Sequence, residues 1–314
     1  MENKFIVSSS PHVKGKDTTQ RIMLDVIIAL LPALVTGVVV FGFRALMLTV
    51  VSVLACVFFE YAIRKILKRS TTIGDLSAVV TGILLAMNVP VTLPFWMLIV
   101  GDFFAIIVVK QLFGGIGKNF ANPAIAARVF MVASFATPMT AWLIPKMTEE
   151  GIERVSGATP LVLMSQGNME ALPTVKEMLI GFRGGCIGET AILGLLLGGI
   201  YLLARKVITI TIPAAYLGTV VIFAFFLGVD PLYHFLAGGV VLGAIFMATD
   251  YVTSPTTEKG KLIYGIGCGI ITMLIRVFGN YPGGVSFSIL LMNIITPHID
   301  RLTKTKPLGG IKTK

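Results

Sequence analysis

Long apolar runs separated by short polar segments are the main pattern of this chain. Five runs lie at about 22–43, 45–63, 75–91, 94–113 and 123–144, and five more lie at about 187–204, 207–227, 232–249, 262–278 and 285–299. An α-helix needs about 20 apolar residues to cross the hydrocarbon core of a bilayer. The pattern therefore predicts an all-α, polytopic membrane protein with about ten transmembrane helices.

Lysine and arginine mark one side of this predicted bundle. When the chain is threaded ten times, the flanking cations all lie on the same side: Lys4, Lys14, Lys16, Arg21, Arg64, Lys65, Lys68, Arg69, Arg205, Lys206, Arg301, Lys304, Lys306, Lys312 and Lys314. The positive-inside rule makes that side cytoplasmic. We therefore expect a cytoplasmic N-terminal tail (1–21), a first five-helix repeat (22–144), a loop on the outer face (145–186), a second five-helix repeat (187–300) and a basic cytoplasmic C-terminal tail (301–314).

A faint internal similarity relates the two groups of helices. The segments TGILLAMNVPVTLP (81–94) and LGAIFMATDYVTSP (242–255) share a glycine, a Val-Thr pair and a final proline in register. Likewise, Pro32-Ala33 with Gly37 matches Pro213-Ala214 with Gly218. Because five is odd, the second copy would enter the membrane from the opposite side, which gives an inverted repeat of the kind found in transporters. Chance similarity between apolar helices is the alternative.

The composition agrees with a membrane protein. Hydrophobic residues make up 55% of the 314 positions and charged residues only 13%, whereas soluble domains carry about 25% charge. The net charge of +10 follows from the cation clusters at helix ends, so we expect no nucleic-acid binding. The three cysteines lie far apart and the three histidines show no ligand spacing, so we expect no metal site in this chain. The polar segment 1–21 lacks the apolar core of a signal peptide.

Three short motifs are candidates for chemistry. The predicted outer loop contains Ser156-Gly157-Ala158-Thr159 followed by Pro160, and its small residues and restricted backbone would leave the Thr159 hydroxyl open to a modifying enzyme. An ordinary turn is the alternative. The other two motifs are GFRGGCIGET at 181–190 and GGIGKN at 114–119, which precedes Asn-Pro-Ala at 122–124.

Together these motifs resemble those of the family that includes the D subunits of Rnf complexes and the B subunits of sodium-pumping NADH:quinone reductases. The similarity extends over nearly the whole chain. It implies FMN joined through its phosphate to the hydroxyl of Thr159 by a separate flavin transferase, with Ser156, Gly157 and Ala158 around the attachment point. It also implies that a second, non-covalent flavin such as riboflavin can lie between the helices.

The short N-terminal tail favours the Rnf type over the quinone-reductase type. That resemblance implies one part, not active alone, of a translocase in the cytoplasmic (inner) membrane whose other parts are the A, B, C, E and G subunits of Rnf. Such complexes move electrons between ferredoxin and NAD while Na⁺ or H⁺ crosses the membrane. The redox chemistry belongs to the flavin, so no catalytic side chain is assigned. The alternatives are the B-type subunit and a solute transporter or channel of the same architecture.

Several other polar residues are candidates for the cofactor site or the ion path. Lys118 and Asn119 belong to a Gly-rich turn that could approach a flavin phosphate, although such glycines often only permit the turn. Arg128 follows on the next helix, and Glu189 opens the sixth predicted helix. Asp102 and Glu189 are the candidates for the ion path, because ionisable groups at membrane depth are commonly functional. A structural ion pair or helix cap is the alternative for both.

Overall fold

The structure is a computed structural model that describes residues 18–148, 151–279 and 283–304. Most of the two predicted cytoplasmic tails lies outside these residues. The described part is mostly helical, with α1 (Thr19–Phe41), α2 (Phe43–Ile66), η1 (Ile73–Asp75), α3 (Ser77–Met87), α4 (Phe95–Phe103), η2 (Phe104–Gln111), α5 (Pro123–Ser134) and α6 (Ala136–Met139) in the first half. The second half contains α7 (Pro160–Ser165), α8 (Val175–Ile180), α9 (Ile192–Ala204), α10 (Thr211–Phe226), α11 (Pro231–Leu236), α12 (Val240–Leu242), η3 (Gly243–Met247), α13 (Glu258–Phe278) and α14 (Val285–Thr303).

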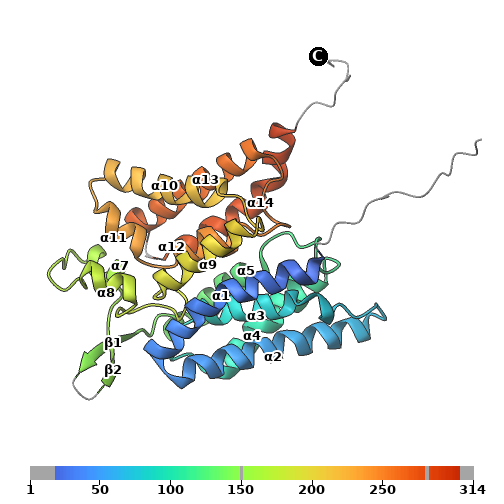
Figure 1. The fold of residues 1–314 in the computed structure, drawn as a ribbon, viewed down its shortest axis with the longest axis horizontal. Helices are drawn as coiled ribbons and strands as arrows, with labels where there is room; N and C mark the ends of the chain where they lie inside the picture. The colour runs from blue at the N-terminus through green and yellow to red at the C-terminus, as the bar shows by residue number, and fades with distance from the viewer. Residues whose placement is uncertain (1–17, 149–150, 280–282, 305–314) are drawn as a thin grey trace, which may run out of the picture.

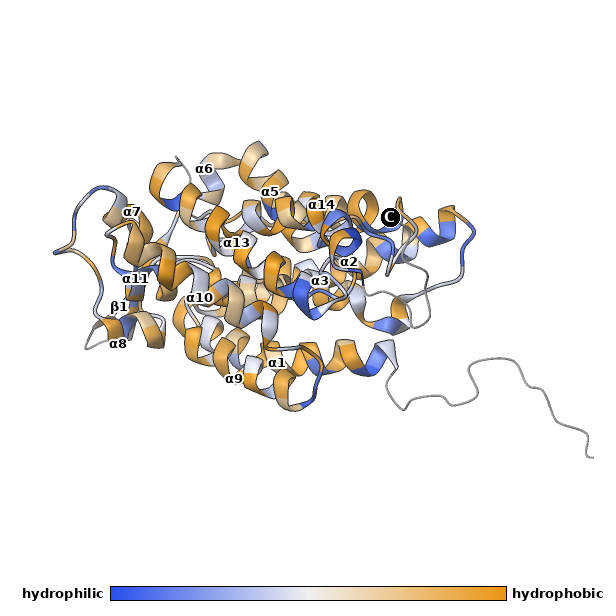
Figure 2. Cartoon of the chain, turned by 90° about the horizontal axis from the view of Figure 1, so that it is seen from above, coloured by the Kyte–Doolittle hydropathy of each residue, from blue (hydrophilic) through white to orange (hydrophobic). Residues whose placement is uncertain are grey.

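The helices have the length and polarity of a membrane protein. Among the described residues, α1, α2 and α13 are long and apolar enough to cross a bilayer, and α3, α5, α9 and α10 are shorter apolar helices. Many of their large apolar side chains face outward, as Leu54 and Phe225 do with 65% and 74% of their surface exposed. Figure 2 shows that hydrophobic residues cover the helices along most of their length and that polar residues gather toward the ends of the molecule. This exposed apolar surface suits contact with lipid.

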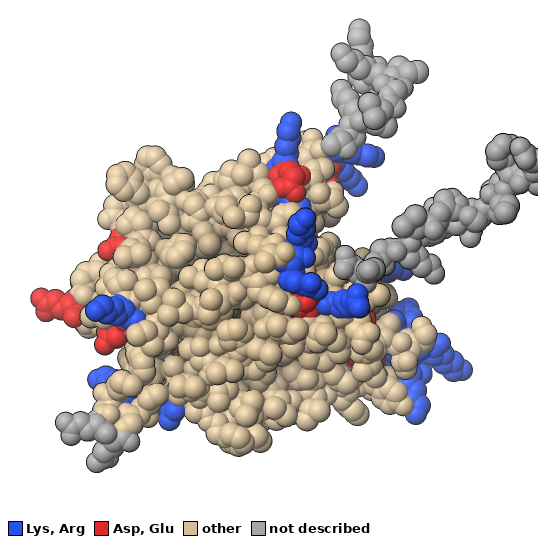
Figure 3. All heavy atoms as spheres, in the orientation of Figure 1, with Lys and Arg blue, Asp and Glu red and all other residues tan. Residues whose placement is uncertain are grey.

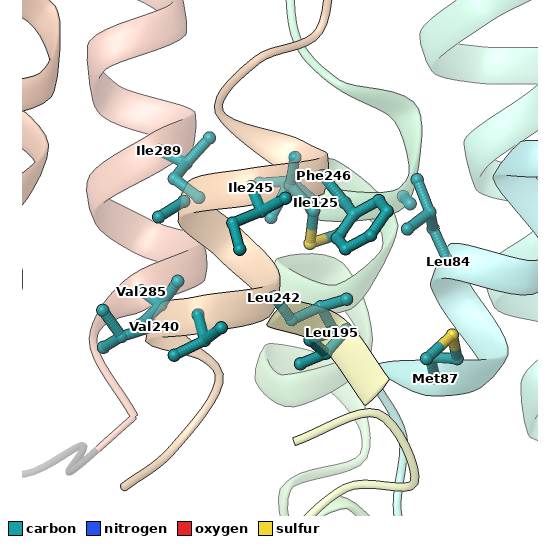
Figure 4. Packing of buried hydrophobic residues seen from close by; sticks show 14 of the residues in the cluster. Leu84, Met87, Ile125, Leu195, Val240, Leu242, Ile245, Phe246, Val285 and Ile289 are labelled. Carbon is teal, nitrogen blue, oxygen red and sulfur yellow. The ribbon is translucent and has the colours of Figure 1, made fainter. Parts of the chain in front are cut away.

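The two halves of the chain lie side by side (Figure 1). Helix α1 packs along α9, and α5 packs on α14, so each half contributes two helices to the boundary. Gly198 of α9 lets α1 and α9 pack closely, since any Cβ at this position would collide with the carbonyl oxygen of Ala29 on α1. The buried core continues across the boundary, and Figure 4 shows Leu84 and Met87 of α3 and Leu195 of α9 near Leu242 and Phe246.

The ends of the molecule differ in charge. Strands β1 (Leu143–Thr148) and β2 (Gly151–Ser156) form an antiparallel hairpin that projects at one end, close to α7 and α8 (Figure 1). On the face drawn in Figure 3, most lysines and arginines gather at the opposite end. On this face, lysines and arginines are therefore concentrated away from the hairpin.

The structure corrects the expected elements in three places. The fifth apolar run, expected at 123–144, is helical only to Ser134 and continues through α6 into β1. The chain is therefore not all-α, because the predicted outer loop contains the hairpin, whose tight return uses Gly151 at a φ of +130°. The eighth run, expected at 232–249, is broken between α11 and α12, where Gly238 adopts a φ of +66°. Hydropathy reports which residues avoid water and not where the backbone turns.

Candidate functional site

A cavity of about 420 Å³ lies at the hairpin end of the molecule, beside Thr159. We call it the threonine cavity. Its wall consists of part of α5, the segment that leads into α7, the glycine-rich segments around 184–189 and 238–239, and the start of α14. The lining residues that matter below are Arg128, Gly157, Ala158, Thr159, Glu189, Gly238, Gly239, Gly284 and Ser286. A volume of this size is typical of cofactor and ligand pockets.

Thr159 is more enclosed than the sequence predicts. The residue is 9% exposed and is the N-cap of the short helix α7, with its Oγ1 accepting a long, 3.4 Å hydrogen bond from the backbone N–H of Val162. The expectation of an exposed hydroxyl is therefore wrong for the folded chain, because the loop folds back over the bundle. Gly157 and Ala158 line the cavity with it, whereas Ser156 ends β2 and is exposed.

Arg128 and Glu189, far apart in the sequence, meet in the wall of this cavity. Arg128 Nη2 lies 2.9 Å from Glu189 Oε1, and both side chains are largely buried. Arg128 Nη1 also donates to Asn88 Oδ1 at 2.6 Å, and Glu189 Oε2 accepts from the backbone N–H of Cys186 at 3.3 Å. The carboxylate and the guanidinium are thus both held by several partners, which fixes their positions.

Two further buried arginines, Arg183 and Arg276, lie behind the Gly238 segment, and neither is among the site residues predicted from the sequence. Arg183 donates to the carbonyls of Leu236 and Glu189, while Arg276 donates to those of His234 and Ala237. In both side chains the Nε atom is buried and has no hydrogen-bond partner among the described residues. The sequence does contain a pattern that could have indicated them, because Arg276 is a single arginine within an apolar run and Arg183 lies within a glycine-rich motif.

The wall of the threonine cavity and the layer behind it contain three arginines and one glutamate. Arg128, which lines the cavity, is paired with the Glu189 carboxylate, whereas Arg183 and Arg276 lie behind the wall. Gly238 lets the backbone approach, since a Cβ there would lie 2.8 Å from Arg276 Nη2. Guanidinium groups bind phosphate and carboxylate oxygens strongly. The arrangement suits a ligand that carries negative charge.

A second cavity, of about 400 Å³, lies between the two halves, with lining residues from α1 and α3 of the first half and from α9 and η3 of the second. We call it the apolar cavity, because aliphatic and aromatic residues make up most of its wall: Ile22, Met23, Val26, Val80, Leu84, Ile116, Leu202, Val207, Ile208, Ile245 and Phe246. Its charged lining residues have partners of their own, as Lys110 Nζ lies 2.7 Å from Glu60 Oε2 and Asp250 accepts from Thr253 at 3.0 Å.

The structure divides the predicted cofactor residues between these two places. Asn119 lines the apolar cavity together with Asn122, away from Thr159. Lys118 is exposed, lies against Gly114 and lines neither cavity. Asn88 connects the two regions, since it accepts from Arg128 and its Nδ2 lies 3.3 Å from the sulfur of Met247, whose carbonyl accepts from Asn122.

Asp102 belongs to neither cavity. It lies on α4, fully buried, with Ser52 and Cys56 of α2 as neighbours. No described group of histidine, cysteine, aspartate and glutamate side chains could hold a metal ion.

The fold and the site define a class: a helical membrane protein with two cavities of about 400 Å³, one of them lined by a buried threonine and an arginine–glutamate pair. Comparison with known proteins gives the family. Residues 6–309 match the NQR2, RnfD, RnfE family, and the chain belongs to it.

Full-length relatives support this assignment. The chain is 50% identical to the D subunit of the Na⁺-translocating ferredoxin:NAD⁺ oxidoreductase complex of Acetobacterium woodii, over 100% of this chain and 98% of the relative. It is 42% identical to the D subunit of the proton-translocating ferredoxin:NAD⁺ oxidoreductase complex of Clostridium ljungdahlii, over 98% and 97%. It is 36% identical to the D subunit of the ion-translocating oxidoreductase complex of Vibrio cholerae, over 97% and 99%.

Proposed function

We propose that this chain is the D-type subunit of an ion-translocating ferredoxin:NAD⁺ oxidoreductase complex and carries FMN as a phosphoester on Thr159. The relatives named for this activity match the chain over nearly its whole length, which supports a role inside such a complex and not as an isolated enzyme. The observation that carries the flavin assignment is the position of the buried Thr159 in the wall of a cavity of about 420 Å³ that Arg128 also lines.

The residues of the threonine cavity fit FMN. The phosphate would be esterified at Thr159 Oγ1, and the nearby guanidinium groups of Arg128 and Arg276 offset its negative charge. The glycines at 238, 239 and 284 leave room for a flat ring system, because they place no side chain in the wall. Bound FMN would supply the electron-transfer chemistry. The protein holds and orients the group.

A direct test is electrophoresis of the purified chain under denaturing conditions. A covalent flavin gives a fluorescent band that migrates with the 33.7 kDa polypeptide. A band without fluorescence, from cells that make the whole complex and its flavin transferase, would refute the assignment.

We also propose that the apolar cavity holds a non-covalent, uncharged flavin such as riboflavin. Its volume suits a small cofactor, and its apolar wall with the two amides of Asn119 and Asn122 suits a ring system with a polar edge. Lys110 is paired with Glu60, and among the described residues the carboxyl group of Asp250 accepts only from Thr253 and from the backbone of Val252, which favours a neutral ligand over a phosphorylated one. Flavin released by acid precipitation, in addition to the band that survives electrophoresis, is the expected result.

We propose a ten-crossing, inverted-repeat topology with both termini in the cytoplasm and the threonine cavity at the outer face. The packing of α1 on α9 and of α5 on α14 supports it, because each pair joins elements with the same position in the two halves. In a chain without its three cysteines, an impermeant thiol reagent should label Gly167→Cys from outside and Lys68→Cys only after the membrane is opened. The reverse pattern would invert the topology.

Asp102 and Glu189 are proposed to lie on the path of the cation, Na⁺ or H⁺. Asp102 is fully buried and has no salt-bridge partner among the described residues. Burial of an ionisable group in a membrane is costly, and such groups commonly serve a function. We expect Asp102→Asn to keep the flavin on Thr159 but to slow ferredoxin-driven cation uptake by vesicles. Unchanged uptake per electron would remove Asp102 from the path.

A further inference from the structure

Asp102 lies where three helices of the first half meet. Ser52 and Cys56 lie on α2, Gly82 on α3 and Asp102 on α4. The helices α2 and α3 touch at the backbone, since a Cβ on Gly82 would lie 2.8 Å from the Cα of Val53. This close approach brings the hydroxyl of Ser52 within reach of the Gly82 carbonyl as well as the Asp102 carboxyl group.

The hydrogen atoms at this junction can be counted. Ser52 Oγ lies 2.6 Å from Asp102 Oδ1 and 2.9 Å from the carbonyl oxygen of Gly82. A serine hydroxyl has one hydrogen to donate. If Asp102 were ionised, its carboxylate and the Gly82 carbonyl could both only accept hydrogen bonds. One of the two short contacts of Ser52 Oγ would then join two oxygen atoms with no hydrogen between them.

A proton on Asp102 resolves the conflict. The acid then donates from Oδ1 to Ser52 Oγ, and Ser52 donates its own hydrogen to the Gly82 carbonyl. The thiol of Cys56, 3.2 Å from Oδ1, can still donate to the same oxygen. Every hydrogen has one acceptor in this arrangement.

The other carboxyl oxygen agrees with the neutral form. Oδ2 is buried and has no hydrogen-bond partner among the described residues. An unpartnered oxygen is less costly on a neutral acid than on a carboxylate, which would place a charge in a low-dielectric interior. Asp102 also has no cation partner in any described salt bridge.

We propose that Asp102 is a buried proton-binding site, held as a neutral carboxylic acid by Ser52 and Gly82, and not a ligand of Na⁺. Hard cations are bound by shells of several oxygen atoms. Here the hydrogen-bond partners of the carboxyl group within the described chain are one hydroxyl and one thiol, and neither large cavity reaches it. This inference rests on the geometry of the junction and is independent of the proposed flavin.

Infrared spectroscopy of the whole complex tests the proposal. A neutral carboxylic acid has a C=O stretching band that an ionised carboxylate lacks, and the band shifts when the acid hydrogen is exchanged for deuterium. We expect the spectrum of wild type minus Asp102→Asn to contain one such band per chain at neutral pH. Glu153→Gln in the hairpin is the matched control, because this exposed side chain should lose only carboxylate bands.

Two further measurements decide between a proton and Na⁺. The band should stay in place when Na⁺ is replaced by K⁺, and Ser52→Ala should move it to higher frequency without removing it, because the acid loses the hydrogen bond that it donates. Ser52→Ala also serves if the Asp102→Asn complex does not assemble. The proposal would be overturned if the spectrum of wild type minus Asp102→Asn contained carboxylate bands and no C=O band of a neutral acid. It would also be overturned if that C=O band appeared only in the absence of Na⁺.

Discussion

The two cavities have almost the same volume, about 420 and about 400 Å³, but differ in what forms their walls. Loops, glycines and helix ends surround the threonine cavity, and two of the arginines behind it keep a buried nitrogen without a described partner. Helix faces with aliphatic side chains surround the apolar cavity, whose Lys110 is paired with Glu60 and whose Asp250 is hydrogen-bonded to Thr253. Size alone therefore does not separate the two sites. The two sites differ in the buried arginine nitrogens without a described partner, which lie behind the threonine cavity.

The contrast predicts two modes of retention. A charged phosphate in the threonine cavity would be held by a covalent bond and by guanidinium groups, so it should survive denaturation. A neutral ring system in the apolar cavity would be held by burial of its apolar surface and by the amides of Asn119 and Asn122, and it should leave when the protein unfolds. The predictions below address this difference.

The largest expected effect is at Thr159. Thr159→Ala should abolish the fluorescent electrophoresis band, because the hydroxyl that forms the ester is gone. Thr159→Ser, which keeps a hydroxyl at the same N-cap position, should retain part of it. Flavin released by acid should be unchanged in both variants. A fluorescent band in Thr159→Ala would place the attachment elsewhere.

The next effect concerns the Arg128–Glu189 pair. Arg128→Met leaves the buried carboxylate of Glu189 without its cation, which should cost about 3 to 5 kcal/mol of stability. The double variant with Glu189→Gln should recover most of this loss. Thermal unfolding in detergent measures both. Lys261→Met, which removes the exposed pair with Glu258 on α13, is the matched control and should cost about 0.5 kcal/mol or less. Equal effects in the two single variants would contradict the burial argument.

A smaller effect is expected at the apolar cavity. Val26→Trp adds bulk to its wall and should lower the acid-released flavin several-fold while the electrophoresis band keeps its intensity. Val35→Trp adds the same bulk to the outer surface of the same helix, where Val35 is 60% exposed, and should change neither signal. Loss of both flavins in Val26→Trp alone would indicate that the cavities are filled together.

The smallest effect is expected at Lys118. Its side chain is exposed and lines neither cavity, so Lys118→Ala should change stability by no more than about 0.5 kcal/mol and leave both flavin signals intact. Asn119→Leu should lower only the acid-released flavin, because Asn119 lines the apolar cavity. A lower electrophoresis signal in Lys118→Ala would show that the exposed lysine acts during flavin attachment.

The sequence by itself determined the membrane class of this protein and the residues at the centre of its candidate site. Apolar runs long enough to span a bilayer are rare in soluble proteins, and the motif around Thr159 can be recognised from the order of its residues alone. Arg128 and Glu189 were also found, because single charges are conspicuous in an apolar chain.

Only the tertiary structure decided how these residues combine. It broke the run at 232–249 at Gly238, enclosed Thr159, and brought Arg183 and Arg276 behind the same wall. It also separated Asn119 from Thr159 and placed Asp102 against Ser52 and Gly82. Hydropathy along a chain measures the preference of each residue for lipid or water, whereas hydrogen bonds and ion pairs between helices depend on which faces meet, and that is set only when the whole bundle packs.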